Sequence, residues 1–197
     1  DKLKKQLQSL EEAKEDCDTL NKESLTKELS AVDNRLKEQT EIETLKKQES
    51  QKAAEMQKAK LFMGNFIDTE IGHSANTIQF IEKVVQEVQP THVYTHSFHD
   101  NHQDHRNTYH ATITACRKIS NLYCYLSPSS TVDFKPNIFV NIDKFIEVKL
   151  LVLSAFSSQS AIRPYLEPDL IKATARYWGR FSNYHLVEPM EVIKGHS

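Results

Sequence analysis

The first 60 residues lack several residue types that the rest of the chain contains. They hold no histidine, aromatic residue, glycine or proline, yet they carry 27 of the 52 charged residues. A segment this polar buries little apolar surface of its own. Residues 61–197 contain all the aromatic residues and are numerous enough to build a hydrophobic core. We therefore predict a charged segment at residues 1–60 and a folded domain at residues 61–197.

Other absences exclude whole classes of protein. The net charge is only -2, and no basic patch with interleaved aromatic residues occurs, so we expect no nucleic-acid partner. No apolar run approaches the length of a membrane span, so we expect no membrane partner. The three cysteines are odd in number and lack the Cys-x-x-Cys spacing, which indicates a reducing, cytoplasmic location. Cys116 and Cys124 lie among apolar residues, and we predict them to be small core residues.

Residues 2–60 favour helix, because lysine, glutamate, glutamine, leucine and alanine dominate them. Apolar residues recur there at a spacing of four and three in two sets, which are out of register by one residue: Leu3, Leu7 and Leu10, then Leu25, Leu29, Val32 and Leu36. This pattern predicts two helices or one interrupted coiled coil, which pairs with itself in a homo-oligomer or with a helix of another chain. The alternative is a solvated or partly disordered charged helix.

After residue 60, helical patterns alternate with short apolar strands. We predict helices at 77–88, 106–119, 143–157 and 168–178, strands at 92–96, 121–126 and 138–142, and an extended segment at 184–193. This alternation indicates an α/β fold, a partial Rossmann-like domain whose mostly parallel sheet has helices on both faces. In such sheets a ligand binds beyond the carboxyl ends of the strands.

A run of histidines follows the strand predicted at 92–96. Six of the nine histidines fall between His92 and His110, and the centre of the run reads Asp-Asn-His-Gln-Asp-His-Arg. His102 and His105 are three residues apart at the start of a helix, so both imidazoles can address one point. Neutral imidazole binds zinc, and a nearby carboxylate such as Asp104 fixes the tautomer of the ring. The run therefore predicts a metal site or an acid–base site.

Four landmarks in order resemble the PIG-L (LmbE-like) family of zinc-dependent N-deacetylases. They are the helix that leads into Gln89-Pro90-Thr91-His92-Val93, the His-x-Asp-His-Arg string at 102–106, Ser157-Ser158-Gln159, and the stretch Ala175-Arg176-Tyr177-Trp178-Gly179-Arg180 with Glu188-Pro189-Met190 beyond it. Phe156 stands where the family usually has a histidine. The resemblance spans about residues 50–193 and is closest from residue 75 onward.

The resemblance implies roles for individual residues. His105 would be a zinc ligand, and His102 would stabilise the oxyanion or act as an acid. Asp104 would be the carboxylate behind the ligands, and Asp100 a loop acid at the border of the site. The implied reaction is metal-assisted hydrolysis, in which an activated water attacks the acetamide of an N-acetylated sugar-type small molecule. A carboxylate takes the proton of the water, and the amine leaves protonated.

The family also has an N-terminal His-Pro-Asp-Asp-Glu element, which supplies the other metal ligands and the general base, and these 197 residues do not contain it. Zinc sites use three or four protein ligands, so we expect an incomplete ligand set in this chain. Two functions stay open: a zinc-dependent deacetylase completed by other residues, or an inactive PIG-L-like domain that acts in association through residues 1–60. A makeshift site from His99, His102, Asp104 and His105 is a further alternative.

Overall fold

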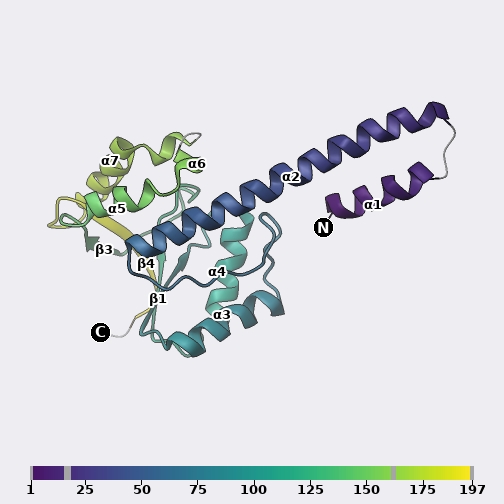
Figure 1. Ribbon diagram of the computed structural model, residues 1–197. Coiled ribbons are helices and arrows are strands. Elements are labelled where there is room, and N and C mark those ends of the chain that lie inside the picture. The colour runs from purple at the N-terminus through teal and green to yellow at the C-terminus, as the bar shows by residue number, and fades with distance from the viewer. Residues whose placement is uncertain (1, 16–18, 161–162, 196–197) are drawn as a thin grey trace. The chain divides into compact units, whose positions relative to one another are not determined.

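The computed structural model describes residues 2–15, 19–160 and 163–195, and the chain forms two compact units (Figure 1). The first unit comprises Asp1–Ala59 with Ala155–Ser158, and the second comprises Lys60–Ser154 with Gln159–Ser197. Among the described residues, no helix is both long enough and apolar enough to cross a membrane. Each unit is described by itself below.

The first unit is helical, as the composition of residues 2–60 predicts. Helix α1 spans Lys2–Glu15 and contacts α2, which runs from Thr19 to Met56. The leucines of α1 are half-buried, and Val32 of α2 is only 4% exposed, so the apolar spacing seen in the sequence marks side chains that are shielded from solvent. Two helices are therefore present, whereas the coiled coil with another chain stays a prediction. Cys17 lies outside the described residues.

A buried glutamate joins α2 to Ser157 and Ser158 within the first unit, and these two serines begin the short helix α6 (Ser157–Ser160). The carboxylate of Glu49 accepts hydrogen bonds from the backbone N–H of Ser158 at 2.8 Å, from the Ser158 hydroxyl at 2.7 Å and from the Ser157 hydroxyl at 3.2 Å. Glu49 is 5% exposed. The hydrogen bond from the Ser158 backbone, followed by that from its hydroxyl, lowers the pKa of Glu49.

We expect Glu49→Gln to lower the free energy of unfolding by about 1 kcal/mol at pH 7, because charge-assisted hydrogen bonds become neutral ones. The folded pKa lies below the ordinary value of 4.5, so this stabilisation is complete above that pH and is lost as the pH falls through the folded pKa. Urea unfolding of the full chain at pH 7 and at pH 3 measures both effects. A difference between variant and wild type that is equally large at pH 3 would contradict the assignment.

The second unit alternates helices and strands in the predicted order. Its elements are α3 (Ala75–Val88), β1 (His92–His96), α4 (Gln103–Ala115), β2 (Asn121–Tyr125), β3 (Ile138–Asn141), α5 (Ile146–Leu153), the 3-10 turn η1 (Pro164–Leu166), α7 (Pro168–Gly179) and β4 (Val187–Lys194). The helix predicted at 143–157 is the largest deviation, because α5 covers only its middle.

Helix α3 has clear signals at both ends. At its start, the hydroxyl of Ser74 accepts a hydrogen bond from the backbone N–H of Thr77 at 3.4 Å. At its end, Gln89 adopts a left-handed conformation with φ of 49°, and Pro90 follows. Helix α3 lies beside α4 (Figure 1).

The N-cap residue of α3, Ser74, is expected to contribute to the stability of the chain. We expect Ser74→Ala to lower the free energy of unfolding by about 1 kcal/mol, because an N-terminal N–H of the helix loses its acceptor. Thermal unfolding of the full chain checks this value, with Ser120→Ala at an exposed bend as the matched control. If the two variants are equally stable, Ser74 does not act as a cap.

The four-stranded sheet has the order β1-β2-β4-β3. β1 and β2 are parallel, whereas β4 is antiparallel to both β2 and β3. The sheet of the described residues is therefore mixed, with β1, β2 and β3 in one direction and β4 in the other, and the predicted mostly parallel character is not confirmed. The reason is that α7 ends at the edge where β1 and β2 also end, so the chain enters β4 from that edge and runs back. Alternating apolar residues report burial, not strand direction.

Part of the core of the second unit is formed by β2 and the end of α4, and a second cluster of buried residues contains Ile142, Ile146 and Ala175. Leu122, Cys124 and Cys116 are fully buried, which confirms the prediction for both cysteines. Burial raises the pKa of Cys124 to about 12, so this thiol stays protonated. A hydrogen bond of 3.3 Å between the Thr95 and Thr112 hydroxyls joins β1 to α4. The expected helices on both faces of the sheet stay a prediction.

Candidate functional site

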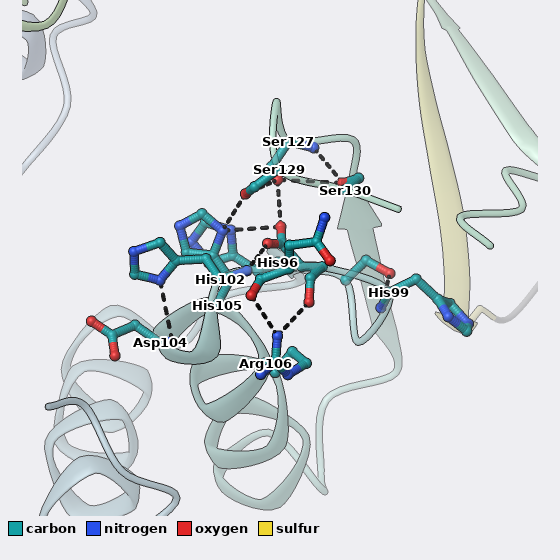
Figure 2. A network of polar contacts seen from close by, with 12 residues as sticks. His96, His99, His102, Asp104, His105, Arg106, Ser127, Ser129 and Ser130 are labelled. Carbon is teal, nitrogen blue, oxygen red and sulfur yellow. Dashed lines mark hydrogen bonds and ion pairs between the residues drawn. The ribbon is translucent and has the colours of Figure 1, made fainter. Parts of the chain in front are cut away.

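The candidate site lies where the parallel strands β1 and β2 end (Figure 2). The loop after β1 runs from Ser97 to His102, and the loop after β2 contains Ser127, Ser129 and Ser130. A bridge between Asp100 and Ser130 holds the loops together, and the N–H of Asn101 donates to the Ser129 carbonyl at 2.9 Å. The histidine run thus occupies the position expected for a ligand site in an α/β sheet.

Asp100 is the centre of this network. Its side chain is completely buried, and its Oδ1 accepts from the backbone N–H of His102 at 2.8 Å. Its Oδ2 accepts from the Ser127 hydroxyl and from Nδ1 of His105, which lies 3.0 Å away. Burial by itself raises the pKa of Asp100, but these hydrogen bonds, that from Ser127 foremost, outweigh it and lower the pKa to about 2. Asp100 is therefore an ionised acceptor at neutral pH.

This carboxylate determines the tautomer of His105. An ionised carboxylate can only accept, so Nδ1 of His105 must carry the proton that it donates to Asp100. The lone pair of a neutral His105 is then on Nε2. A carboxylate behind a histidine is the usual support of a metal-binding imidazole. His105 thus has the tautomer that a metal ligand needs.

His102 has the opposite tautomer. It is the N-cap of α4, and its Nδ1 accepts a hydrogen bond from the backbone N–H of Asp104 at 3.3 Å (Figure 2). Because Nδ1 uses its lone pair there, a neutral His102 carries its proton on Nε2. The ring is stacked on that of His105, with centroids 4.6 Å apart. Of these two neighbouring imidazoles, His102 therefore presents an N–H donor on Nε2, and His105 presents a lone pair on Nε2.

A third histidine, His96, extends this stack. Its ring lies parallel to that of His105 at 3.7 Å, and its Nε2 is 3.1 Å from the Tyr125 hydroxyl. Burial, followed by the neighbouring His105, lowers the pKa of His96 to about 4, so the ring is neutral at pH 7. Burial raises the pKa of Tyr125 to about 12. His96 therefore adds no positive charge beside His105.

Asp104 contacts the loop around Thr69, and the role that the family resemblance implies for it stays a prediction. It is 4% exposed, and its Oδ2 accepts from the backbone N–H of Thr69 at 2.7 Å. Gln103 donates to the carbonyl of the same Thr69, whose φ is 70°. The left-handed conformation is costly for threonine, so these contacts hold a strained loop against the start of α4. The carboxylate that contacts His105 is Asp100, and Asp104 fastens this loop.

The donor set can be compared with the needs of a metal ion. Two groups bring three potential ligand atoms within 4.8 Å of one another: His96, Asp100 and His105, and Asp68, His102 and Asp104. In the first group the stacked rings are nearly parallel, so their lone pairs do not converge on one ion. In the second group, Nδ1 of His102 already caps α4. Among these residues, therefore, only Nε2 of His105 is prepared to bind a metal ion.

Sequence reasoning missed several members of the network. His96 and the three serines were not predicted as site residues, and Asp100 was predicted only at the border. Their signal was positional, because they follow two parallel neighbouring strands. The side chain of His99 points away from the stack (Figure 2), and His99 belongs to neither cluster of potential ligands found in the described residues. The makeshift site that includes His99 is thus not assembled.

Comparisons with known proteins identify the family and the fold. A family model described as PIG-L, GlcNAc-PI de-N-acetylase, matches residues 7–116, more than half of the chain. This range begins earlier than the motif resemblance and ends before its last two landmarks. The uncharacterized deacetylase YaiS of Escherichia coli K12 is 33% identical over 101 residues, which are 48% of this chain and 55% of the relative. The chain thus spans about half the length of that curated relative.

Three solved structures share the fold. The conserved protein TT1542 of Thermus thermophilus matches with a TM-score of 0.68 and 19% identity, over 78% of this chain and 75% of its own. The 4-carboxy-2-hydroxymuconate hydratase GalB of Pseudomonas putida KT2440 matches with a TM-score of 0.68 and 17% identity, over 80% of this chain and 75% of its own. The N,N'-diacetylchitobiose deacetylase of Pyrococcus horikoshii matches with a TM-score of 0.64 and 21% identity, over 77% of this chain and 64% of its own. A deacetylase and a hydratase share this fold, so residues, not topology, must decide the reaction.

Proposed function

Because this chain belongs to the PIG-L (GlcNAc-PI de-N-acetylase) family, we propose that it is a metal-dependent deacetylase that hydrolyses the amide of an N-acetylated sugar. The proposal is supported by the similarity to a bacterial deacetylase across 48% of the chain. The family is typically metal-dependent, and in this chain Nε2 of His105 is prepared as a metal ligand by the contact of Nδ1 with Asp100. Zinc is our choice of metal, because imidazole and carboxylate are its usual partners in hydrolases.

The observation that carries the proposal is the pair of opposite tautomers at His102 and His105. Amide hydrolysis needs a Lewis acid and a donor for the oxyanion that develops on the carbonyl. Nε2 of His105 offers a lone pair for the metal, since Asp100 holds the proton on Nδ1. Nε2 of His102 offers a proton to the oxyanion, since Nδ1 accepts from the helix. The two roles require these two forms of imidazole.

The reaction adds water to the amide carbon, breaks the C–N bond and releases acetate and an amine. A bound metal ion would supply Lewis acidity and make that water more acidic. In this chain, His102 would donate to the carbonyl oxygen as it becomes negative. Asp100 would keep His105 in its ligand form, and Asp104 would keep the Thr69 loop at the rim. The proton of the water passes to a carboxylate, a role that the family resemblance gives to its N-terminal element.

One ligand does not hold a metal firmly, so we propose that the remaining ligands come from residues other than these 197. A cytoplasmic location and association through residues 1–60 belong to the same proposal. Ile42 and Leu45 of α2 are 54% and 43% exposed, and they are the apolar side chains through which such association would occur. Sedimentation of the full chain measures this association. A monomer at every concentration would contradict it.

The test of the proposed function uses the full-length gene product. We expect zinc to co-purify with it, and acetate to be released from N-acetylglucosamine in a reaction that a chelator stops and added zinc restores. Metal content is measured by atomic emission, and acetate by an enzyme-coupled assay. A protein that is folded, contains no metal after zinc loading and releases no acetate would overturn the proposal. Acetate release that is insensitive to the chelator would overturn its metal dependence.

A further inference from the structure

A polar cavity lies at the end of α7, and none of its lining residues belongs to the histidine stack. Its volume is about 490 Å³, and it opens to solvent. Its side chains come from the last turns of α7 and from the loop before β4: Arg176, Arg180, Ser182, Asn183, Tyr184 and His185. These side chains carry two guanidinium groups, an imidazole, two hydroxyls and an amide. The cavity is thus rich in hydrogen-bond donors.

Both arginines are held in place by neighbours other than carboxylates. The guanidinium of Arg180 lies over the rings of Tyr177 and Phe181, at 5.5 and 5.1 Å from their centroids. Arg176 donates to Nδ1 of His185, and its distance to the His185 carbonyl is 3.4 Å. Because Nδ1 of His185 accepts this hydrogen bond, a neutral His185 carries its proton on Nε2 and is a further donor. Fixed donors lose less entropy when they bind a ligand.

The backbone also brings the loop onto α7. A Cβ atom at Gly179 would lie 2.5 Å from the carbonyl oxygen of His185 and 2.9 Å from that of Tyr184. Only glycine allows this approach, which sets His185 beside Arg176. The cavity is therefore formed by the fold of the loop and not by the chance direction of long side chains.

The positive charge of this cavity is not balanced. None of the lining residues is acidic, and within the described residues neither Arg176 nor Arg180 forms an ion pair with a carboxylate. A neighbouring hollow shares Arg176 and His185, and its acidic residue Glu147 pairs with Lys172 at 2.7 Å. Two guanidinium groups that line one cavity without an acidic partner are suited to bind an oxyanion.

We propose that this cavity is a phosphate-binding subsite for the phosphoryl group of an N-acetylated sugar phosphate. Phosphate suits the cavity better than carboxylate does. The cavity has more hydrogen-bond donors than the two oxygens of a carboxylate can accept, whereas a phosphoryl group has three terminal oxygens. A neutral sugar fits less well, because Arg180 already covers faces of the Tyr177 and Phe181 rings. The phosphate assignment stands on the cavity alone, whereas its attachment to a sugar rests on the proposed deacetylase function.

The register of the sheet puts the cavity on the same edge as the histidine stack. Tyr125 at the end of β2 pairs with Met190 of β4, and Val187 of β4 pairs with Asn141 at the end of β3. The loop before Val187 therefore lies beyond the carboxyl ends of β1 and β2. Strands in a sheet are about 4.8 Å apart, so β1 and β4, which are two positions apart in the sheet, are separated laterally by about 10 Å. A sugar that carries a phosphoryl group on a short extension can reach both sites.

The experiment titrates the full chain with inorganic phosphate, N-acetylglucosamine and N-acetylglucosamine 6-phosphate by calorimetry at low salt. We expect the sugar phosphate to bind at least tenfold tighter than inorganic phosphate, and the neutral sugar to bind weakest. Arg176→Gln and Arg180→Gln should each weaken binding of the sugar phosphate about tenfold, since each removes a charge-assisted contact. Arg117→Gln is the control, because Arg117 is an exposed arginine that pairs with Glu82 elsewhere. Circular dichroism verifies that each variant is folded.

Several results would overturn the subsite. A double Arg176→Gln, Arg180→Gln variant that is folded and binds within twofold of wild type would exclude the cavity. Equal affinity for inorganic phosphate and the sugar phosphate would exclude a substrate-borne phosphoryl group. Acetate release from unphosphorylated N-acetylglucosamine is measured in parallel on the full-length gene product, because one ligand does not hold a metal firmly. Loss of that activity with intact phosphate binding refutes only the proposed function, and the reverse result refutes only the subsite.

Discussion

Asp100→Ala lowers the free energy of unfolding of the full chain by about 3 kcal/mol, because a buried hydrogen-bonded network loses its centre. Three donors, the Ser127 hydroxyl, the His102 N–H and Nδ1 of His105, lose their acceptor at once. The Asp100 side chain is completely buried, so water does not replace it without a change in the packing. Urea unfolding, followed by circular dichroism, measures the loss.

The matched control for Asp100 is Asp133→Ala, which removes an exposed carboxylate from the loop between β2 and β3. We expect that variant to stay within about 0.5 kcal/mol of wild type. Asp100→Asn preserves the size of the side chain and separates charge from packing. We expect it to lower zinc affinity 10- to 100-fold even where the fold survives, since the amide no longer orients His105. If Asp100→Ala and Asp133→Ala are equally stable, the network does not hold the two loops together.

The second large effect is a difference between alanine variants of two neighbouring histidines, His105 and His102. We expect His105→Ala in the full-length gene product to abolish zinc retention, and with it acetate release. We expect His102→Ala to retain zinc and to lower kcat about 10²- to 10³-fold, as the loss of one oxyanion donor does in other hydrolases. The difference follows from the tautomers, because only His105 presents a lone pair on Nε2.

Zinc content after dialysis and the rate of acetate release are measured on the same preparations. His110→Ala is the control, because His110 lies further along α4 and stacks on His73. That variant should retain both zinc and activity. Loss of zinc in His102→Ala, with zinc retained in His105→Ala, would reverse the assignment of the two residues.

The sequence predicted the elements of the second unit well because their signals are local. Strand 92–96 agrees with β1 to the residue, since a proline precedes it and β-branched residues lie within it. Helix 168–178 agrees with α7 to one residue, because Pro168 suits a first turn. The helix predicted from Asp143 begins only at Ile146, because Asp143 accepts a hydrogen bond from the backbone of Leu186 and its segment forms a turn.

The candidate site was less accessible to sequence reasoning, since its contacts come from distant residues. Ser127 reaches Asp100 from the loop after β2, and no spacing within the histidine run reveals that contact. Asp104 was the obvious carboxylate because it adjoins His105 in sequence. In space, Asp100 is the partner of His105 because α4 begins between them and turns the ring back toward the loop. The roles of His102, Asp104 and His105 stay predictions.

The order of the strands has a consequence for the exchange of backbone hydrogens. Among the described residues β1 pairs only with β2, so its backbone has one paired and one unpaired side. In a parallel pair, amides along a border strand alternate between these sides, and we expect every second amide from His92 to His96 to exchange with deuterium much faster than its neighbours. A strand that docks against this border would slow the fast set alone. Deuterium uptake along β1 thus reports directly on whatever covers the flank next to the histidine stack.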